Sequence, residues 1–173
     1  MRTVHTADLT AGERAQARAV VDAAFGGRFA DTDWAHALGG LHVLAEAGPR
    51  IVAHASVVQR ALLVDGVAMR AGYVEAVAVH PDHQRLGYAT ALMDEVERII
   101  RAAYDIGALS ASSAGAGLYA RRGWLRWPGT TAVLTPDGLR PTPGDDGSTY
   151  VLPVVTTRLE GVLACDFRSG DSW

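Results

Sequence analysis

Residues 84–89, which read Gln-Arg-Leu-Gly-Tyr-Ala, have the residue types and the spacing to bind a phosphorylated cofactor. Gly87 lies where a helix is expected to begin. The first amides of a helix have no internal partner and carry the positive end of the helix dipole. Consecutive N–H groups from Arg85 to Ala89 can therefore bind a pyrophosphate, and Gly87 lets the backbone approach it closely. The alternative interpretation is an ordinary turn between a strand and a helix.

The elements on either side of this turn favour the cofactor interpretation. Residues 73–79 alternate apolar side chains at the two-residue period of a strand, and Pro81 ends the strand by removing an N–H donor. Glu75, within the strand, could accept a proton directly or through one water, although a polar residue on an exposed strand face would fit the same alternation. After the turn, apolar residues recur at helical spacing, namely Leu92, Met93, Val96, Ile99, Ile100 and Ala103.

Composition and charge restrict the class of protein. The chain has 173 residues, of which 49% are hydrophobic and 20% charged, as expected for a single folded domain spanning residues 1–173. The net charge of −3 argues against a nucleic-acid partner and leaves room for a cationic small molecule. With no hydrophobic leader and no membrane-length apolar stretch, a cytoplasmic protein is expected. All 16 basic residues are arginines, which excludes chemistry that depends on lysine.

The first part of the chain predicts a pair of helices followed by strands. Residues 10–13 have the spacing of a capping box, so a helix is expected from there to about Phe25. Asp31, Thr32 and Asp33 offer N-caps for a short helix that ends before Gly39. Residues 41–46 and 50–63 read as strands, and Asp65-Gly66 predicts a hairpin into the strand that ends at Val79.

The second part predicts alternating short elements. A buried strand is expected at residues 107–110, then a helix capped by Ser112 or Ser113 and ended by Gly123. Further strands are expected at residues 124–127, 130–134 and 150–154. The segment 135–148 is rich in Pro, Gly and Asp and reads as a loop, and residues 163–173 form a tail. The order βααβββαβαβ, with extra C-terminal strands, indicates an α/β fold in which helices flank a mixed sheet.

The cofactor turn resembles the acetyl-CoA motif of the GNAT acetyltransferase superfamily, (Gln/Arg)-x-x-Gly-x-(Gly/Ala). The resemblance implies the GNAT acyltransferase fold, with splayed central strands, helices on both faces and acetyl-CoA in the gap. It assigns cofactor binding to the residues around the strand end and the turn, which are Val77, Ala78, Val79, Gln84, Arg85, Leu86, Gly87, Tyr88 and Ala89. The backbone N–H of Val77 would stabilise the oxyanion, and Val79 would bind the pantetheine arm.

The chain also resembles, nearly from end to end, the aminoglycoside 2′-N-acetyltransferases of mycobacteria and related actinobacteria. The segments that carry this resemblance include Asp-Thr-Asp-Trp at 31–34, Gly-Tyr-Val-Glu at 72–75, Leu-Tyr-Ala at 118–120 and the terminal Gly-Asp-Ser-Trp at 170–173. It implies transfer of an acetyl group from acetyl-CoA to the 2′-amine of an aminoglycoside antibiotic, which would confer resistance. It also implies a homodimer.

The family resemblance assigns roles to individual residues. Glu75 would remove the proton of the amine and Tyr119 would protonate the departing thiolate, whereas a structural role for Tyr119 in the core is the alternative. The terminal carboxylate of Trp173 would bind the substrate or act as a base, with a frayed terminus as the alternative. A polycationic substrate needs several converging acidic groups, and the resemblance implies Asp33, Glu75, Asp145, Asp171 and the terminal carboxylate of Trp173. It also implies Ser110 as a polar residue near the substrate.

Some features do not fit this assignment so readily. Arg28 lies in a loop where relatives can carry an acidic residue, so it could weaken binding of a cation if it faced the pocket. His80 and His83 lack further ligands at the spacing of a metal site, and no metal is expected. The rival functions are acetylation of another amine, such as an amino sugar, a cell-wall precursor or a polyamine, and a non-catalytic module that binds acyl-CoA.

Overall fold

The structure, a computed structural model, describes residues 1–113 and 115–173. The chain separates into two compact units. The first comprises Met1–Val58 and Val74–Ile99, and the second comprises Gln59–Tyr73 and Ile100–Trp173. Strands β3 (Arg50–Val64) and β4 (Val67–Val79) and helix α3 (Tyr88–Ala103) contribute residues to both units.

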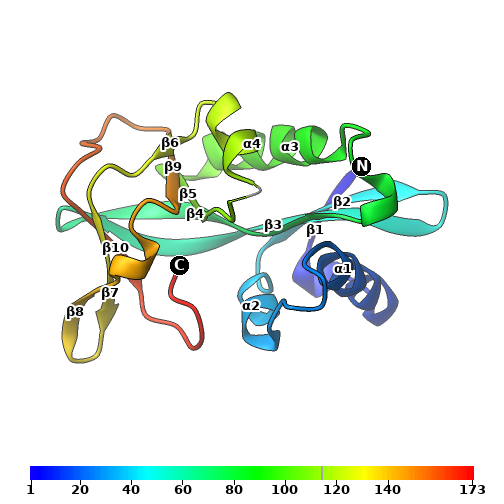
Figure 1. The fold of residues 1–173 in the computed structure, drawn as a ribbon, viewed down its shortest axis with the longest axis horizontal. Coiled ribbons are helices and arrows are strands. Elements are labelled where there is room, and N and C mark those ends of the chain that lie inside the picture. The colour runs from blue at the N-terminus through cyan, green and yellow to red at the C-terminus, as the bar shows by residue number, and fades with distance from the viewer. Residues whose placement is uncertain (114) are drawn as a thin grey trace. The chain divides into compact units, whose positions relative to one another are not determined.

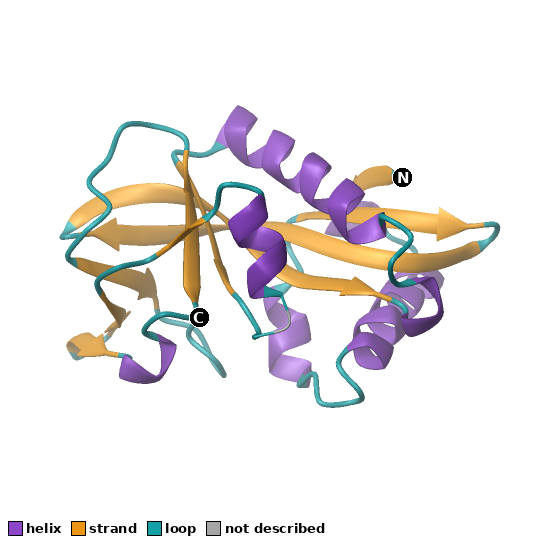
Figure 2. Cartoon of the chain, turned by 45° about the horizontal axis from the view of Figure 1, so that its top comes forward, coloured by secondary structure: helices purple, strands orange, loops and turns teal. Residues whose placement is uncertain are grey.

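The first unit is a layer of strands between helices. β1 (Arg2–His5) pairs with β2 (Leu41–Ala47), and β2 pairs with β3, in both cases antiparallel. Helices α1 (Ala11–Ala24) and α2 (Asp31–His36) cover one face of these strands, and α3 covers the other (Figures 1 and 2). Two short 3₁₀ turns, η1 (Thr6–Asp8) and η2 (Pro81–His83), follow strands. Apolar side chains of α1 and α2 form a core with Leu44, Ile51, Ala76 and Ala78 of the strands.

The predicted N-cap of α1 is confirmed, whereas the predicted N-caps of α2 are wrong. The capping box of α1 is confirmed, since the Glu13 amide donates to Thr10 Oγ1 and the Thr10 amide donates to Glu13 Oε2. For α2 the predicted N-caps are wrong, because the helix already begins at Asp31 and Ala30 occupies the cap without a side-chain hydrogen bond. The acidic residues lie instead in the first turn, where they favour the helix dipole.

The second unit combines parallel and antiparallel strand pairs. The N-terminal residues of β4 pair in parallel with β5 (Ile106–Ser110), and β5 pairs antiparallel with β9 (Thr149–Pro153), which is flanked by β6 (Leu125–Arg126). The C-terminal residues of β3 pair with β10 (Val162–Asp166), which runs parallel to β7 (Thr130–Thr135). This mixture of pairings with flanking helices confirms the predicted α/β class.

Three details of the second unit correct the sequence predictions. The segment expected to be a loop, 135–148, contains a strand, β8 (Gly138–Pro141), paired with β7, and a 3₁₀ turn, η3 (Pro143–Asp145). The segment expected to be a tail contributes most of β10. Helix α4 (Ala116–Arg121) has Gly115 as its N-cap, so neither Ser112 nor Ser113 is the cap, although Ser112 Oγ accepts from the Gly115 amide at 3.3 Å.

Two fully buried histidines link the strands of the first unit. His42 Nδ1 lies 2.9 Å from His54 Nε2, and His54 Nδ1 lies 2.8 Å from the carbonyl oxygen of Ala76. At the other end, Thr6 Oγ1 lies 2.7 Å from His42 Nε2. The Trp34 ring packs against both imidazoles, with centroids 6.4 Å from His42 and 5.4 Å from His54. Hydrogen bonds therefore cross β2 and β3 to reach β4.

The chain of hydrogen bonds ends at an unusual backbone position. Ala76 has a φ of 51°, in the left-handed region that L residues rarely adopt, although it lies within strand β4. Such a conformation costs about 1–2 kcal/mol for a residue with a Cβ. The hydrogen bond from His54 satisfies the carbonyl that this conformation turns into the core, and thereby helps to stabilise it.

None of the helices in the described part of the chain combines the length and the apolar character that crossing a membrane requires.

The buried histidines predict a loss of stability in mild acid. Burial lowers the pKa of His42 from 6.5 to about 4 and the pKa of His54 from 6.5 to about 3, so both are neutral in the folded protein at neutral pH. The unfolded chain binds protons on these side chains below about pH 6.5. The free energy of unfolding should therefore be constant above that pH and fall as the pH falls toward 4, by up to about 1.4 kcal/mol per pH unit for each histidine.

Urea denaturation at several pH values between about 7 and 5 measures this slope, in a window above the range where most carboxylates titrate. Replacing the exposed His5 by Gln should leave the slope nearly unchanged, whereas His54→Asn should reduce it. A free energy of unfolding that does not change across this window would contradict the assignment of two neutral buried histidines.

Candidate active site

The end of β4 presents alternate residues for contact with a ligand. Glu75, Val77 and Val79 are half-buried, whereas Val74, Ala76 and Ala78 between them are buried. The alternation follows from the strand period, and His54 fixes the backbone in the middle of this segment through the Ala76 carbonyl. Glu75 and Val77 thus flank a backbone position that a buried hydrogen bond holds in place.

The turn after β4 has the geometry of a phosphate-binding loop. Its backbone has positive φ at Arg85 (62°) and at Gly87 (86°), and Gln84 Nε2 donates back to the Val79 carbonyl at 3.3 Å. Helix α3 begins directly afterwards, and the Gly87 carbonyl accepts from the Ala91 amide at 3.1 Å. The amides of the first turn therefore lie at the N-terminus of a 16-residue helix, where they lack intrahelical acceptors.

The space beside Gly87 fits an approaching pyrophosphate. A Cβ placed on Gly87 would have no heavy atom of the described residues within 4 Å outside its chain neighbours, and residues 84–87 are exposed. Packing therefore does not require glycine here. The positive φ favours it, and the absence of a side chain keeps the backbone open to a ligand. Together these features fit the cofactor that the turn sequence predicts.

Tyr119 on α4 is a candidate acid in the second unit. Its side chain is 7% exposed and packs against the rings of Trp124 and Tyr150, with centroids 6.1 and 6.2 Å away. Burial raises the pKa of the Tyr119 phenol to about 12. The phenol therefore remains protonated at physiological pH, which is the state that a proton donor must have.

Acidic side chains gather around η3 and the C-terminal tail of the same unit. Burial raises the pKa of Asp145, and the charges of Asp171 and Asp146 raise it further. Asp146 is engaged by Thr131, whose amide and hydroxyl donate to Asp146 Oδ1 at 2.7 and 2.9 Å. Asp171 is exposed and Asp145 is half-buried. This arrangement favours a cationic ligand, because a positive charge would relieve the repulsion between the carboxylates.

The tail that carries Asp171 is held by its last residue. Trp173 is 5% exposed, and its indole Nε1 donates to Thr142 Oγ1 at 3.0 Å. A frayed terminus is therefore not what the structure shows. Ser110 ends β5 with an exposed side chain, and its Oγ lies 3.4 Å from Ser148 Oγ, in the turn that follows η3.

The predicted site residues divide between the two units. The first unit contains Asp33 on α2, Glu75 and residues 77–79 on β4, and residues 84–89 of the turn. The second unit contains Ser110, Tyr119, Asp145, Asp171 and Trp173. Within the second unit Asp171 lies close enough to Asp145 for its charge to help raise the pKa of Asp145.

Sequence reasoning missed three buried polar residues whose hydrogen bonds reach the backbone next to Glu75 and next to Trp173. His42, His54 and Arg60 lie on strands whose other residues are mostly buried and apolar. A histidine or arginine within such a run is the signal that could have identified them, because a buried polar group needs a specific partner.

Arg28, His80 and His83, which the family assignment does not explain, also lie in the first unit. Arg28 is exposed in the loop after α1. The rings of His80 and His83 lie edge to face, 5.8 Å apart, beside the cofactor turn. In residues 1–113 and 115–173, no group of three or more His, Cys, Asp or Glu side chains could hold a metal ion.

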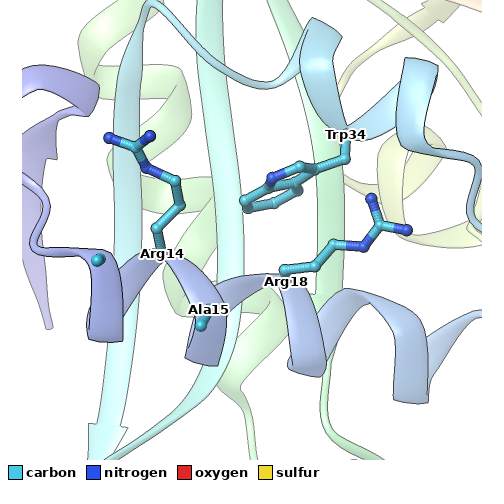
Figure 3. A pocket seen from close by; sticks show the side chains of 5 residues that line it. Arg14, Ala15, Arg18 and Trp34 are labelled. Carbon is cyan, nitrogen blue, oxygen red and sulfur yellow. The ribbon is translucent and has the colours of Figure 1, made fainter.

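A separate pocket of about 390 Å³ is lined by Ala11, Arg14, Ala15, Arg18 and Trp34. Figure 3 shows the guanidinium groups of Arg14 and Arg18, both on α1, on either side of the Trp34 ring. Arg18 is already paired with Asp22 at 2.8 Å and with Asp31 at 3.2 Å. None of the residues that line this pocket is acidic, so the pocket does not suit a cationic substrate.

Comparisons with known proteins identify the fold and the family. A family profile described as an acetyltransferase (GNAT) domain matches residues 5–126. An aminoglycoside 2′-N-acetyltransferase from Mycolicibacterium fortuitum is 50% identical over 179 residues, covering 99% of this chain and 91% of that protein.

Solved structures with lower identity share the fold. A GNAT family acetyltransferase from Brucella melitensis, in complex with acetyl-CoA, has a TM-score of 0.64 and 18% identity, covering 97% of this chain and 96% of that one. Eis1 from Mycobacterium abscessus has a TM-score of 0.60 and 23% identity, covering 72% of this chain but only 32% of the Eis1 chain. The family match and the identity to the M. fortuitum protein show that this chain belongs to the GNAT acetyltransferases, in the family of the aminoglycoside 2′-N-acetyltransferases.

Proposed function

We propose that this acetyltransferase moves the acetyl group of acetyl-CoA to the 2′-amine of aminoglycoside antibiotics and thereby confers resistance to them. The observation that carries the proposal is the acidic group of Asp145, Asp146 and Asp171 around η3 and the C-terminal tail, where burial and then the charges of the other two carboxylates raise the pKa of Asp145. A polycationic acceptor would neutralise this group. The 50% identity to an enzyme named for this reaction supports the same conclusion.

The cofactor supplies a thioester whose carbonyl carbon the amine attacks, so that a C–N bond forms, the C–S bond breaks and coenzyme A leaves as a thiol. In our proposal the amides of residues 85–89 bind the pyrophosphate at the start of α3, with Gln84 supporting the turn. Val77, Ala78 and Val79 contact the pantetheine arm, and the Val77 amide stabilises the negative charge that develops on the carbonyl oxygen.

Proton transfer requires a base and an acid. We assign the base to Glu75, whose half-buried carboxylate can take a proton from the amine directly or through a water. We assign the acid to Tyr119, whose phenol carries its proton at neutral pH and can donate it to the departing thiolate. The carboxylate that the family resemblance assigns to Trp173 is the alternative acceptor of the amine's proton.

The acceptor would be recognised by charge. Asp33, Glu75, Asp145, Asp171 and the terminal carboxylate of Trp173 would pair with its ammonium groups, while Ser110 would contact the sugar rings. We also propose that residues 1–173 form one catalytic domain. By family resemblance we also propose a cytoplasmic homodimer with no nucleic-acid or membrane partner.

The acceptor class can be tested directly by thiol release from acetyl-CoA. An aminoglycoside with a 2′-amine should react at least about 100-fold faster than its 2′-hydroxyl analogue, because the analogue lacks the nucleophile. A linear polyamine should react poorly. Mass spectrometry of the product locates the acetyl group, and fast N-acetylation of the 2′-hydroxyl analogue at another amine would refute the regiochemistry.

Glu75→Gln should lower kcat by about 100-fold while leaving the affinity for acetyl-CoA within about twofold of the wild type, because only the proton acceptor is lost. Steady-state kinetics and calorimetric titration with acetyl-CoA measure the two quantities. Glu160→Gln, on an exposed glutamate paired with Arg158, is the matched control and should retain full activity. Unchanged turnover in Glu75→Gln would exclude this residue as the base. If the protein is instead a non-catalytic module that binds acyl-CoA, neither the wild type nor any variant will show turnover.

Tyr119→Phe should lower kcat by about 100-fold, because it removes the hydroxyl and keeps the ring. With a pKa of about 12, the phenol stays protonated well above neutral pH, so wild-type kcat should not fall between about pH 8 and 10 on account of Tyr119. A pH profile of kcat tests both statements. Tyr104→Phe, at a half-buried tyrosine that follows α3, is the control, and equal rates in the two variants would argue that Tyr119 is structural.

A further inference from the structure

Arg60 on β3 is a buried cation that no proposed catalytic step uses. The residue is 4% exposed, and its guanidinium lies over the Tyr73 ring, with Cζ 4.7 Å from the centroid. Burying a guanidinium costs free energy unless hydrogen bonds satisfy its N–H groups. The partners of this group therefore show what the buried charge stabilises.

The Arg60 guanidinium donates three hydrogen bonds of 2.8 Å each. Nε donates to the carboxylate oxygen Oδ1 of Asp166, and Nη2 donates to the carbonyl oxygen of the same residue. Nη1 donates to the carbonyl oxygen of Ser172, the residue next to Trp173. Asp166 is the last residue of β10, which pairs with β3. Arg60 thus joins the start of the C-terminal tail, at Asp166, to its end.

Other contacts fix the same tail. Cys165 Sγ lies 3.3 Å from the Ser172 carbonyl oxygen, and Arg168 Nε donates to the Asp171 carbonyl at 2.9 Å. The Arg168 guanidinium also packs on the Tyr73 ring, with Cζ 5.4 Å from the centroid. The segment 167–172 is therefore a closed loop whose two ends meet at Arg60. Of these contacts, those of Arg60 are the most buried and the shortest.

We propose that Arg60 is a positioning residue for acceptor binding: it clamps the tail so that Asp171 and Trp173 are held beside Asp145. The role of those three residues in binding the acceptor rests on the proposed function, whereas the clamp itself does not. An arginine suits this role because its planar fork can donate in three directions at once, which the single ammonium of a lysine cannot reproduce with the same geometry.

The clamp can be tested without any assay of acetyl transfer. Under native conditions, a carboxypeptidase that prefers aromatic termini should release Trp173 from the Arg60→Met chain at least about tenfold faster than from the wild type, because release requires local opening of the tail. Mass spectrometry of the intact protein follows the reaction. The control is Arg70→Met, which removes an exposed arginine whose ion pair with Asp105 measures 3.5 Å, and its release rate should equal that of the wild type.

If Arg60→Met does not fold, Arg60→Lys is the second variant. It keeps the positive charge but cannot form the three hydrogen bonds of the guanidinium, so faster release of Trp173 is again expected. Equal release rates in a folded Arg60 variant and the wild type would overturn the clamp.

Kinetics test whether the clamp serves acceptor binding. Arg60→Lys should raise KM for the 2′-amino aminoglycoside about tenfold and leave KM for acetyl-CoA within about twofold, because only the tail is displaced. In a chain that lacks residues 172–173 the same substitution should have little further effect on kcat/KM, since the two changes act through one element. Additive losses would show that Arg60 acts elsewhere and would overturn its positioning role.

The two experiments separate the two proposals. If no variant, including the wild type, acetylates an aminoglycoside, the proposed function fails, and the carboxypeptidase result still decides whether Arg60 clamps the tail.

Discussion

The first unit is built so that the amides at the start of α3 have no intrahelical acceptor and are open to a ligand. A helix can offer them to a ligand only if the preceding chain turns sharply and leaves no side chain in the way. Positive φ at Arg85 and Gly87 makes that turn, and the proline in η2 separates it from β4. The rest of the unit holds these parts in place, with a buried core beneath β4 and a hydrogen bond from His54 to Ala76 within the strand.

The second unit illustrates how burial sets the charge of a side chain according to its partners. Tyr119 is surrounded by rings and retains its proton, whereas Arg60 is just as buried and remains charged because carboxylate and carbonyl oxygens satisfy it. Asp145 lies between these extremes, since burial and the neighbouring charges of Asp171 and Asp146 both raise its pKa. A candidate proton donor, a structural cation and a candidate binding site for cations thus occur in one unit, and the described residues of the chain contain no metal ligand set.

The elements that depend on residues adjacent in the chain could be predicted from the sequence. The capping box of α1 and the strand, turn and helix around Gly87 depend on neighbours in the chain, and the structure agrees with each of them. Strand β8 was not predicted, because its residues Gly138–Pro141 carry turn signals and pair only through the β7 hairpin. The partners of Arg60 and His54 were also beyond sequence reasoning, since Asp166 is 106 positions from Arg60 and Ala76 is 22 from His54.

The hydrogen bonds of the buried pair His42 and His54 all donate in the same direction along the chain of side chains. A carbonyl oxygen can only accept, so His54 must carry its proton on Nδ1 and present Nε2 as an acceptor to His42. His42 must then also be protonated on Nδ1 and accept from the hydroxyl of Thr6. Neither ring can change tautomer alone without leaving two acceptors face to face. The pair therefore behaves as one aligned dipole whose positive end faces the Ala76 carbonyl, one residue from the carboxylate of Glu75.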